Sequence, residues 1–129
     1  MTMYKHRILY TEDDPDTREL VILLLGRRNC EVVATDNKDF AILSARTEHF
    51  DLYLLDNWLQ DTSGIDLCRE LRSINANTPI LFYSAAAYDT DKESALKSGA
   101  QGYLTKPVET EHLVNEVMRL IEGVVHCTA

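Results

Sequence analysis

Clustered carboxylates are the first feature of this chain that could carry chemistry. Glu12, Asp13 and Asp14 come just after a short apolar segment, and Asp56 comes directly after another. Like charges repel one another, most strongly where water is partly excluded, so such a cluster calls for a cation. Mg²⁺ prefers oxygen ligands and keeps several waters. We therefore predict a Mg²⁺ site with Asp13 and Asp56 as direct ligands and Glu12 binding directly or through a water, while Asp14 caps the next helix.

Three further positions suggest what the cation would assist. An aspartate at the end of an apolar strand is costly unless it has a task, and a carboxylate beside Mg²⁺ can attack a phosphoryl group to form an acyl phosphate. The ammonium of Lys106 and the hydroxyl of Ser84 would stabilise the transferred oxygens. Asp56, Lys106 and Ser84 are thus candidates for phosphoryl transfer onto Asp56. The plainer alternative for residues 12–14 is that all three acids favour a helix N-terminus.

Apolar segments of strand length alternate with segments of helical period, and they must position these residues. Strands are predicted at 7–10, 31–34, 51–56, 79–84 and 102–105, and helices at 15–28, 37–48 (capped by Asp36), 64–73 (capped by Ser63), 90–98 and 109–123. Five such strand–helix units predict an α/β fold with a parallel sheet covered by helices on both faces. Ligands bind beyond the carboxyl ends of such strands, where every predicted strand but the second is followed by a candidate residue. The second strand is therefore expected at the margin of the sheet.

Composition limits the classes of function. With 129 residues and a hydrophobic fraction of 45%, the chain is expected to form a single domain over 1–129, with a core at about 6–122 and a short C-terminal tail. A net charge of −8 disfavours direct binding to nucleic acid, and no apolar run is long enough for membrane insertion. Cys30, Cys68 and Cys127 fit no zinc-site spacing and are expected to be free thiols in the cytoplasm.

Four motifs in order resemble the receiver domain of two-component response regulators. They are ILYTEDDPDTREL, DLYLLDNWLQDTSGIDLCRELR, PILFYSA and GAQGYLTKP, and the resemblance covers residues 6–122. It implies a flavodoxin-like (βα)5 fold with strand order 2-1-3-4-5. It also implies phosphoryl transfer from a sensor histidine kinase or a histidine phosphotransfer protein onto Asp56, in a signalling domain that assists its own phosphorylation and dephosphorylation but is not an enzyme.

The same resemblance implies roles for individual residues. Asp56 matches the phosphoryl acceptor, Glu12 and Asp13 the acidic metal-binding pair, Trp58 the metal ligand that acts through its backbone carbonyl, Lys106 the lysine of the site, and Ser84 and Tyr103 the switch pair. The Lys106–Pro107 bond matches one that is cis in the family. Glu12 stands where aspartate is commoner, so the resemblance leaves its contact with the metal open. The expected output is a change in the surface formed by the fourth helix, fifth strand and fifth helix, read by a downstream protein.

Three rival functions share parts of this pattern. An FMN-binding module has this fold, but its phosphate loop would not carry the acids of residues 12–14. A phosphatase of the haloacid dehalogenase type needs a second acid where this chain has Trp58. A pseudo-receiver, which acts as an interaction domain without phosphate, is the remaining alternative, and the presence of Asp13, Asp56, Ser84 and Lys106 argues against it.

Overall fold

Five strands alternate with five helices along the chain. The computed structural model describes residues 4–126, and the side chains of residues 4–123. The elements are β1 (His6–Thr11), α1 (Pro15–Gly26), β2 (Cys30–Thr35), α2 (Lys38–Thr47), β3 (Leu52–Leu55), α3 (Gly64–Ile74), β4 (Ile80–Ser84), α4 (Asp89–Lys97), β5 (Gly102–Thr105) and α5 (Thr110–His126). The predicted α/β class is confirmed.

The strands form one parallel sheet in the order β2-β1-β3-β4-β5, as predicted. β2 lies at the edge, as expected for the strand that ends without a candidate residue. The register aligns Thr11 with Leu55, and Ser84 with Thr105. The loops that follow β1, β3, β4 and β5 therefore leave the sheet at one edge, which is where the candidate residues were expected to meet.

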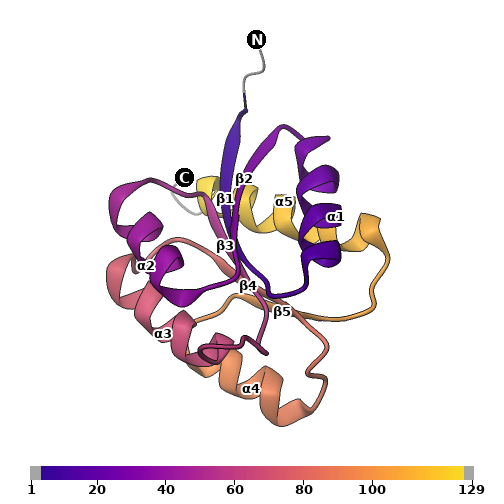
Figure 1. The fold of residues 1–129 in the computed structure, drawn as a ribbon. Coiled ribbons are helices and arrows are strands. Elements are labelled where there is room, and N and C mark those ends of the chain that lie inside the picture. Colours follow the sequence, from indigo (N-terminus) through magenta and orange to yellow (C-terminus); the bar gives the residue numbers. More distant parts are fainter. Residues whose placement is uncertain (1–3, 127–129) are drawn as a thin grey trace.

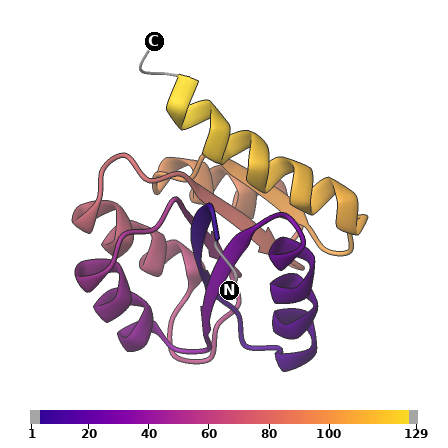
Figure 2. The ribbon, with the colours of Figure 1, turned by 90° about the horizontal axis from the view of Figure 1, so that it is seen from above.

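Helices cover both faces of the sheet, and each face has its own apolar cluster. Figure 1 shows α1 and α5 on one side and α2 and α3 on the other, and Figure 2 shows the same arrangement from above. On the first face, Ile8, Leu54 and Leu81 of the sheet belong to the same cluster as residues of α1 and α5. On the other face, buried residues of α2, α3 and α4 complete the second cluster. Near-continuous apolar strands such as LYLL suit this double burial.

The helix ends follow local capping, and several of the predicted boundaries need correction. Asp14 caps α1 and accepts a hydrogen bond from the backbone N–H of Thr17 at 3.2 Å, as predicted. α2 is capped by Asn37 and not by Asp36, because the Asn37 side chain accepts a hydrogen bond from the N–H of Phe40 at 2.8 Å. α1 ends at Gly26, two residues before the predicted end at residue 28, and Asn29 just beyond it has a left-handed backbone with a φ of 62°. α5 runs on to His126, beyond the predicted end at residue 123.

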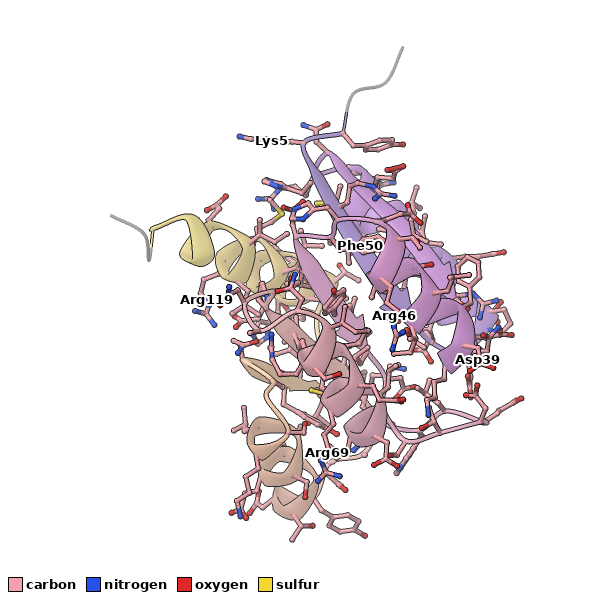
Figure 3. The ribbon with its side chains drawn as sticks, turned by 90° about the vertical axis from the view of Figure 1, so that its left-hand side faces the viewer. Lys5, Asp39, Arg46, Phe50, Arg69 and Arg119 are labelled. Atoms are coloured by element: carbon pink, nitrogen blue, oxygen red, sulfur yellow. The ribbon has the colours of Figure 1, made fainter. Side chains whose placement is uncertain are left out.

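Charged side chains of the outer helices point to solvent. Figure 3 shows Asp39 near the start of α2, Arg46 near its end and Arg69 on α3, all of them exposed. An acid in the first turn and a base in the last turn both complement the helix dipole.

Cys30 and Cys68 are free and buried, as expected for small core residues, whereas Cys127 lies outside the described residues. Within residues 4–126, no helix combines the length and the apolar character that crossing a bilayer requires.

Candidate functional site

The carboxyl edge of the sheet brings together side chains from three strand ends. The ammonium nitrogen of Lys106, after β5, lies 2.6 Å from Oε1 of Glu12, after β1, and 3.4 Å from Oδ2 of Asp56, after β3. These pairs are 94 and 50 positions apart in the sequence. The lysine is thus shared by two carboxylates that are themselves buried. The Lys106–Pro107 bond is cis, as the resemblance implied.

Glu12 is the most enclosed acid of the site, with 1% of its surface exposed. Its Oε1 also accepts a hydrogen bond from the hydroxyl of Tyr10 at 3.0 Å, and its Oε2 accepts one from the backbone N–H of Asp14 at 3.3 Å. Burial raises the pKa of Glu12, and the neighbouring Asp56 acts in the same direction, whereas Lys106 opposes them.

Lys106 is held as a cation by its two acidic neighbours. Burial by itself lowers the pKa of a lysine, but here the hydrogen bond to Glu12 and the charges of Asp56 and Glu12 outweigh burial, so the pKa of Lys106 is raised. The ring of Tyr83 lies on another side of the ammonium, with its centroid 5.2 Å from the nitrogen. The positive charge is therefore in place before any phosphoryl group arrives.

Asp56 is buried where β3 ends, and the backbone around it is tightly packed. Its Oδ1 accepts a hydrogen bond from the backbone N–H of Trp58 at 3.2 Å, and its own N–H donates to the carbonyl of Thr11 at 3.1 Å. Gly64 packs against the backbone of Asp56, since a Cβ at position 64 would lie 2.4 Å from the Asp56 carbonyl oxygen. Trp58 thus meets the site through its backbone, and its side chain is 62% exposed.

Asp13 carries the oxygen that best fits a bound cation. Its Oδ1 is buried and has no hydrogen-bond partner among the described residues, an arrangement that is costly for an ionised carboxylate. Burial raises the pKa of Asp13, a backbone N–H from Gln60 lowers it, and the charge of Asp56 raises it further. With Glu12, the site holds three carboxylates against the single ammonium of Lys106. A divalent cation would balance this excess.

The set of possible metal ligands is small. Within the described part of the chain, no three His, Cys, Asp or Glu side chains lie close enough together to hold a metal ion. The side chains of Asp13 and Asp56 fit a cation that is completed by a backbone carbonyl and waters, because Mg²⁺ usually binds through one or two carboxylates. Glu12 differs from these two acids, because its Oε1 accepts hydrogen bonds from Tyr10 and Lys106 and its Oε2 accepts one from the N–H of Asp14.

Ser84 and Tyr103 meet through the segment that follows β4. Ser84 is fully buried, and its hydroxyl accepts a hydrogen bond from the N–H of Ala86 at 3.2 Å. The hydroxyl of Tyr103 donates to the carbonyl of the same Ala86 at 2.6 Å. The Tyr103 ring stacks on the buried Phe82, with centroids 5.5 Å apart. Tyr103 therefore lies against the β4–α4 segment.

Two residues of the site were not predicted from the sequence. Tyr10 and Tyr83 surround the Glu12–Lys106 pair, yet each reads in the sequence as an ordinary strand aromatic. One signal was available for Tyr10. It precedes Glu12 by two positions, and Glu12 directly follows β1, so continued strand alternation would place both side chains on the same face. A register within one strand cannot, however, show that the hydroxyl reaches the carboxylate.

Comparisons with known proteins identify the family of this chain. The family described as response regulator receiver domain matches residues 8–118. The cell cycle transcriptional regulator CtrA of Caulobacter vibrioides is 32% identical over 115 residues, which cover 89% of this chain and 50% of that protein. The two-component response regulator PhoP of Pseudomonas aeruginosa is 34% identical over 125 residues, covering 95% of this chain and 56% of PhoP. This chain spans about half the length of the curated relatives it matches first.

Solved structures show the same fold. The CheY-like receiver domain from Methanospirillum hungatei aligns with a TM-score of 0.90 at 21% identity, covering 94% of this chain and 97% of that one. The receiver domain of the sensor histidine kinase PA1611 from Pseudomonas aeruginosa, solved with magnesium coordinated in its active-site cleft, aligns with a TM-score of 0.83 at 28% identity, covering 91% of this chain and 98% of that one. Since the family match takes in most of the chain, this protein belongs to the response regulator receiver domain family.

Proposed function

We propose that this chain accepts a phosphoryl group on Asp56 from a sensor histidine kinase or a histidine phosphotransfer protein. The observation that carries the proposal is the position of Lys106, whose ammonium lies 3.4 Å from the Asp56 carboxylate. An oxygen of Asp56 forms the new bond to phosphorus while the bond from phosphorus to the donor breaks, and the donor leaves with that electron pair. Lys106 then neutralises charge on the phosphoryl oxygens, and the hydroxyl of Ser84 donates a hydrogen bond to one of them.

The residues that would hold magnesium are Asp13, Asp56 and the backbone carbonyl of Trp58. The unpartnered Oδ1 of Asp13 supports this choice, as does the magnesium in the cleft of the PA1611 receiver. When bound, the ion neutralises charge on the transferred oxygens. The side chains do the rest: Asp56 supplies the nucleophile, and Lys106 and Ser84 hold the oxygens at fixed positions.

Phosphorylation of the isolated protein tests the proposal. Wild type and Asp56→Asn are incubated with acetyl phosphate and Mg²⁺, and the added phosphoryl group is read from the intact mass. We expect labelling of wild type only, and loss of labelling when Mg²⁺ is chelated. Equal labelling of both proteins would refute Asp56 as the acceptor. An unlabelled wild type would favour a pseudo-receiver that works without phosphate.

We propose that phosphorylation changes the surface formed by α4, β5 and α5 through Ser84 and Tyr103. A downstream protein in the cytoplasm, and not nucleic acid, would bind this changed surface. Ser84 and Tyr103 bond to the same residue, so a phosphoryl group that draws the Ser84 hydroxyl toward it would change the segment on which Tyr103 rests. Tyr103→Ala is expected to keep phosphorylation and to abolish the change on that surface, measured by amide hydrogen exchange. A phosphorylation-induced change in hydrogen exchange as large in Tyr103→Ala as in wild type would contradict the route.

A further inference from the structure

Tyr10 is a buried tyrosine whose hydroxyl belongs to the site and not to the core. Its ring is fully enclosed in the apolar cluster beneath α1 and α5, together with Leu54 and Leu81. At the end of that ring, the hydroxyl donates to Oε1 of Glu12 at 3.0 Å. A buried hydroxyl needs a partner, and this one has a carboxylate that is itself almost fully enclosed.

Hydrogen-bond donors of the protein meet both oxygens of Glu12. Oε1 is shared by the Tyr10 hydroxyl and the Lys106 ammonium, and Oε2 is taken by the N–H of Asp14. Three donors thus converge on one carboxylate that has 1% of its surface exposed. Asp13, the adjacent acid, has the opposite pattern, because its buried Oδ1 has no hydrogen-bond donor within the described part of the chain. The two acids after β1 have different partners and so suit different tasks.

The lysine is enclosed as well as paired. Only 19% of the Lys106 side chain is exposed, and the Tyr83 ring lies beside the ammonium. Of its two carboxylate contacts, the one to Glu12 is the shorter, at 2.6 Å against 3.4 Å to Asp56. The position of the ammonium beside Asp56 therefore depends on where Glu12 stands. Burial and the Glu12 charge raise the pKa of Tyr10, so its phenol stays protonated and keeps donating.

We propose that Glu12 holds Lys106 in place instead of ligating the metal, and that Tyr10 is the positioning residue that fixes Glu12. This inference rests on the proposed phosphorylation of Asp56. A glutamate has one more rotatable bond than an aspartate, so a carboxylate at this length needs an extra contact to keep one position. The Tyr10 hydroxyl supplies that contact and, being neutral, adds no charge to the site. A fixed ammonium matters because preorganised charge is what stabilises the transferred phosphoryl group.

The first test removes the hydroxyl and keeps the ring. Tyr10→Phe is compared with Tyr53→Phe, which removes the hydroxyl of another fully buried tyrosine on the opposite face of the sheet. At saturating acetyl phosphate and Mg²⁺, we expect phosphorylation of Tyr10→Phe to be slower by about tenfold, the loss of one orienting contact. Tyr53→Phe is expected to match wild type. Unlabelled wild type would refute the proposed function, whereas labelled wild type with an equally fast Tyr10→Phe would refute this inference alone.

The second test separates lysine positioning from metal binding, with no phosphoryl donor present. Isothermal titration with Mg²⁺ is expected to give dissociation constants for Tyr10→Phe and Glu12→Asp within about twofold of wild type, because neither change touches a metal ligand. Asp13→Asn, which changes a proposed ligand, is expected to weaken binding at least about tenfold. If Tyr10→Phe or Glu12→Asp weakened Mg²⁺ binding as much as Asp13→Asn does, Glu12 would be a metal ligand and the proposal would fail.

The third test asks whether Tyr10 acts through Glu12. Glu12→Asp keeps the charge but shortens the side chain, so the carboxylate loses the Tyr10 hydroxyl. In that background, Tyr10→Phe should slow phosphorylation no further. A full additional tenfold loss would show that Tyr10 acts independently of Glu12 and would overturn the inference. Should Tyr10→Phe fail to fold, as judged by circular dichroism, the expected slow phosphorylation and normal Mg²⁺ affinity of Glu12→Asp still test the role of Glu12.

Discussion

Gly64→Ala is the substitution for which the structure allows the sharpest prediction about the acceptor site. Gly64 is the first residue of α3, and its N–H donates to the carbonyl of Asn57 at 2.9 Å. A Cβ here would lie 2.4 Å from the carbonyl oxygen of Asp56, 2.7 Å from Cα of Asn57 and 2.9 Å from a ring carbon of Phe82. Two of these three atoms belong to the backbone, which cannot rotate away as a side chain can.

The size of the effect follows from how far the backbone must move. Ordinary contacts begin at 3.4 Å, so the Asp56 carbonyl must retreat by about 1 Å. Overpacking of this kind costs roughly 1–3 kcal/mol of folding free energy. A misplacement of about 1 Å at a reacting group lowers its rate by about 100-fold. We therefore expect the rate of Asp56 phosphorylation to fall much further than the stability does.

Two measurements on each variant check this. Urea unfolding gives the free energy of unfolding, and the rate of labelling by acetyl phosphate with Mg²⁺ reports on the site. Gly26→Ala is the matched control, because apart from its chain neighbours and the backbone of its own helix, no described atom lies within 4 Å of its Cβ position at the end of α1. It should keep the wild-type rate and gain up to about 1 kcal/mol from the better helix propensity of alanine. A wild-type rate and stability in Gly64→Ala would show that the backbone of Asp56 and Asn57 can move away from the added methyl group without cost, and would refute the reasoning.

Three further predictions concern other parts of the fold. Arg72→Lys should lower the free energy of unfolding by about 2–3 kcal/mol in urea titrations, because its guanidinium donates to three backbone carbonyls at once and an ammonium on a different stem cannot replace it; an unchanged midpoint would contradict this. Asn37→Ala should cost about 1 kcal/mol through the lost cap of α2, whereas Asp36→Ala should cost much less, and the reverse order would restore Asp36 as the cap. Cys30 and Cys68 should stay unlabelled by iodoacetamide at about pH 8 until urea is added, because burial blocks access to both thiols and raises their pKa, so that little thiolate forms. Peptide mapping by mass spectrometry measures the labelling of each cysteine, and fast labelling of the native protein would contradict the prediction.

Much of the fold could be predicted because its signals are local. The alternation of apolar strands with helical segments depends on side-chain periods of two and 3.6, which are visible in the residues themselves. Helix ends were less certain where two residues compete for one role. Asp36 and Asn37 are both good caps, and the choice depended on which side chain reached the N–H of Phe40 in the folded loop.

The content of the candidate site was also predictable, for a topological reason. Parallel strands place their carboxyl ends at one edge, so the residues after β1, β3, β4 and β5 had to gather there once the strand order was known. That argument places Glu12, Asp56 and Lys106 near one another. It does not say which of them touch.

The sequence by itself determined which chemical groups meet at this edge: carboxylates, a hydroxyl and an ammonium, each at a strand end. Only the tertiary structure decided how they pair. Glu12 was predicted to bind the metal directly or through a water, which stays a prediction. In the structure its Oε1 accepts hydrogen bonds from Lys106 and Tyr10, whereas Oδ1 of Asp13 has no hydrogen-bond partner among the described residues. Hydrogen bonds depend on tenths of an ångström between side chains that are 94 positions apart, and no local pattern in the chain encodes such distances.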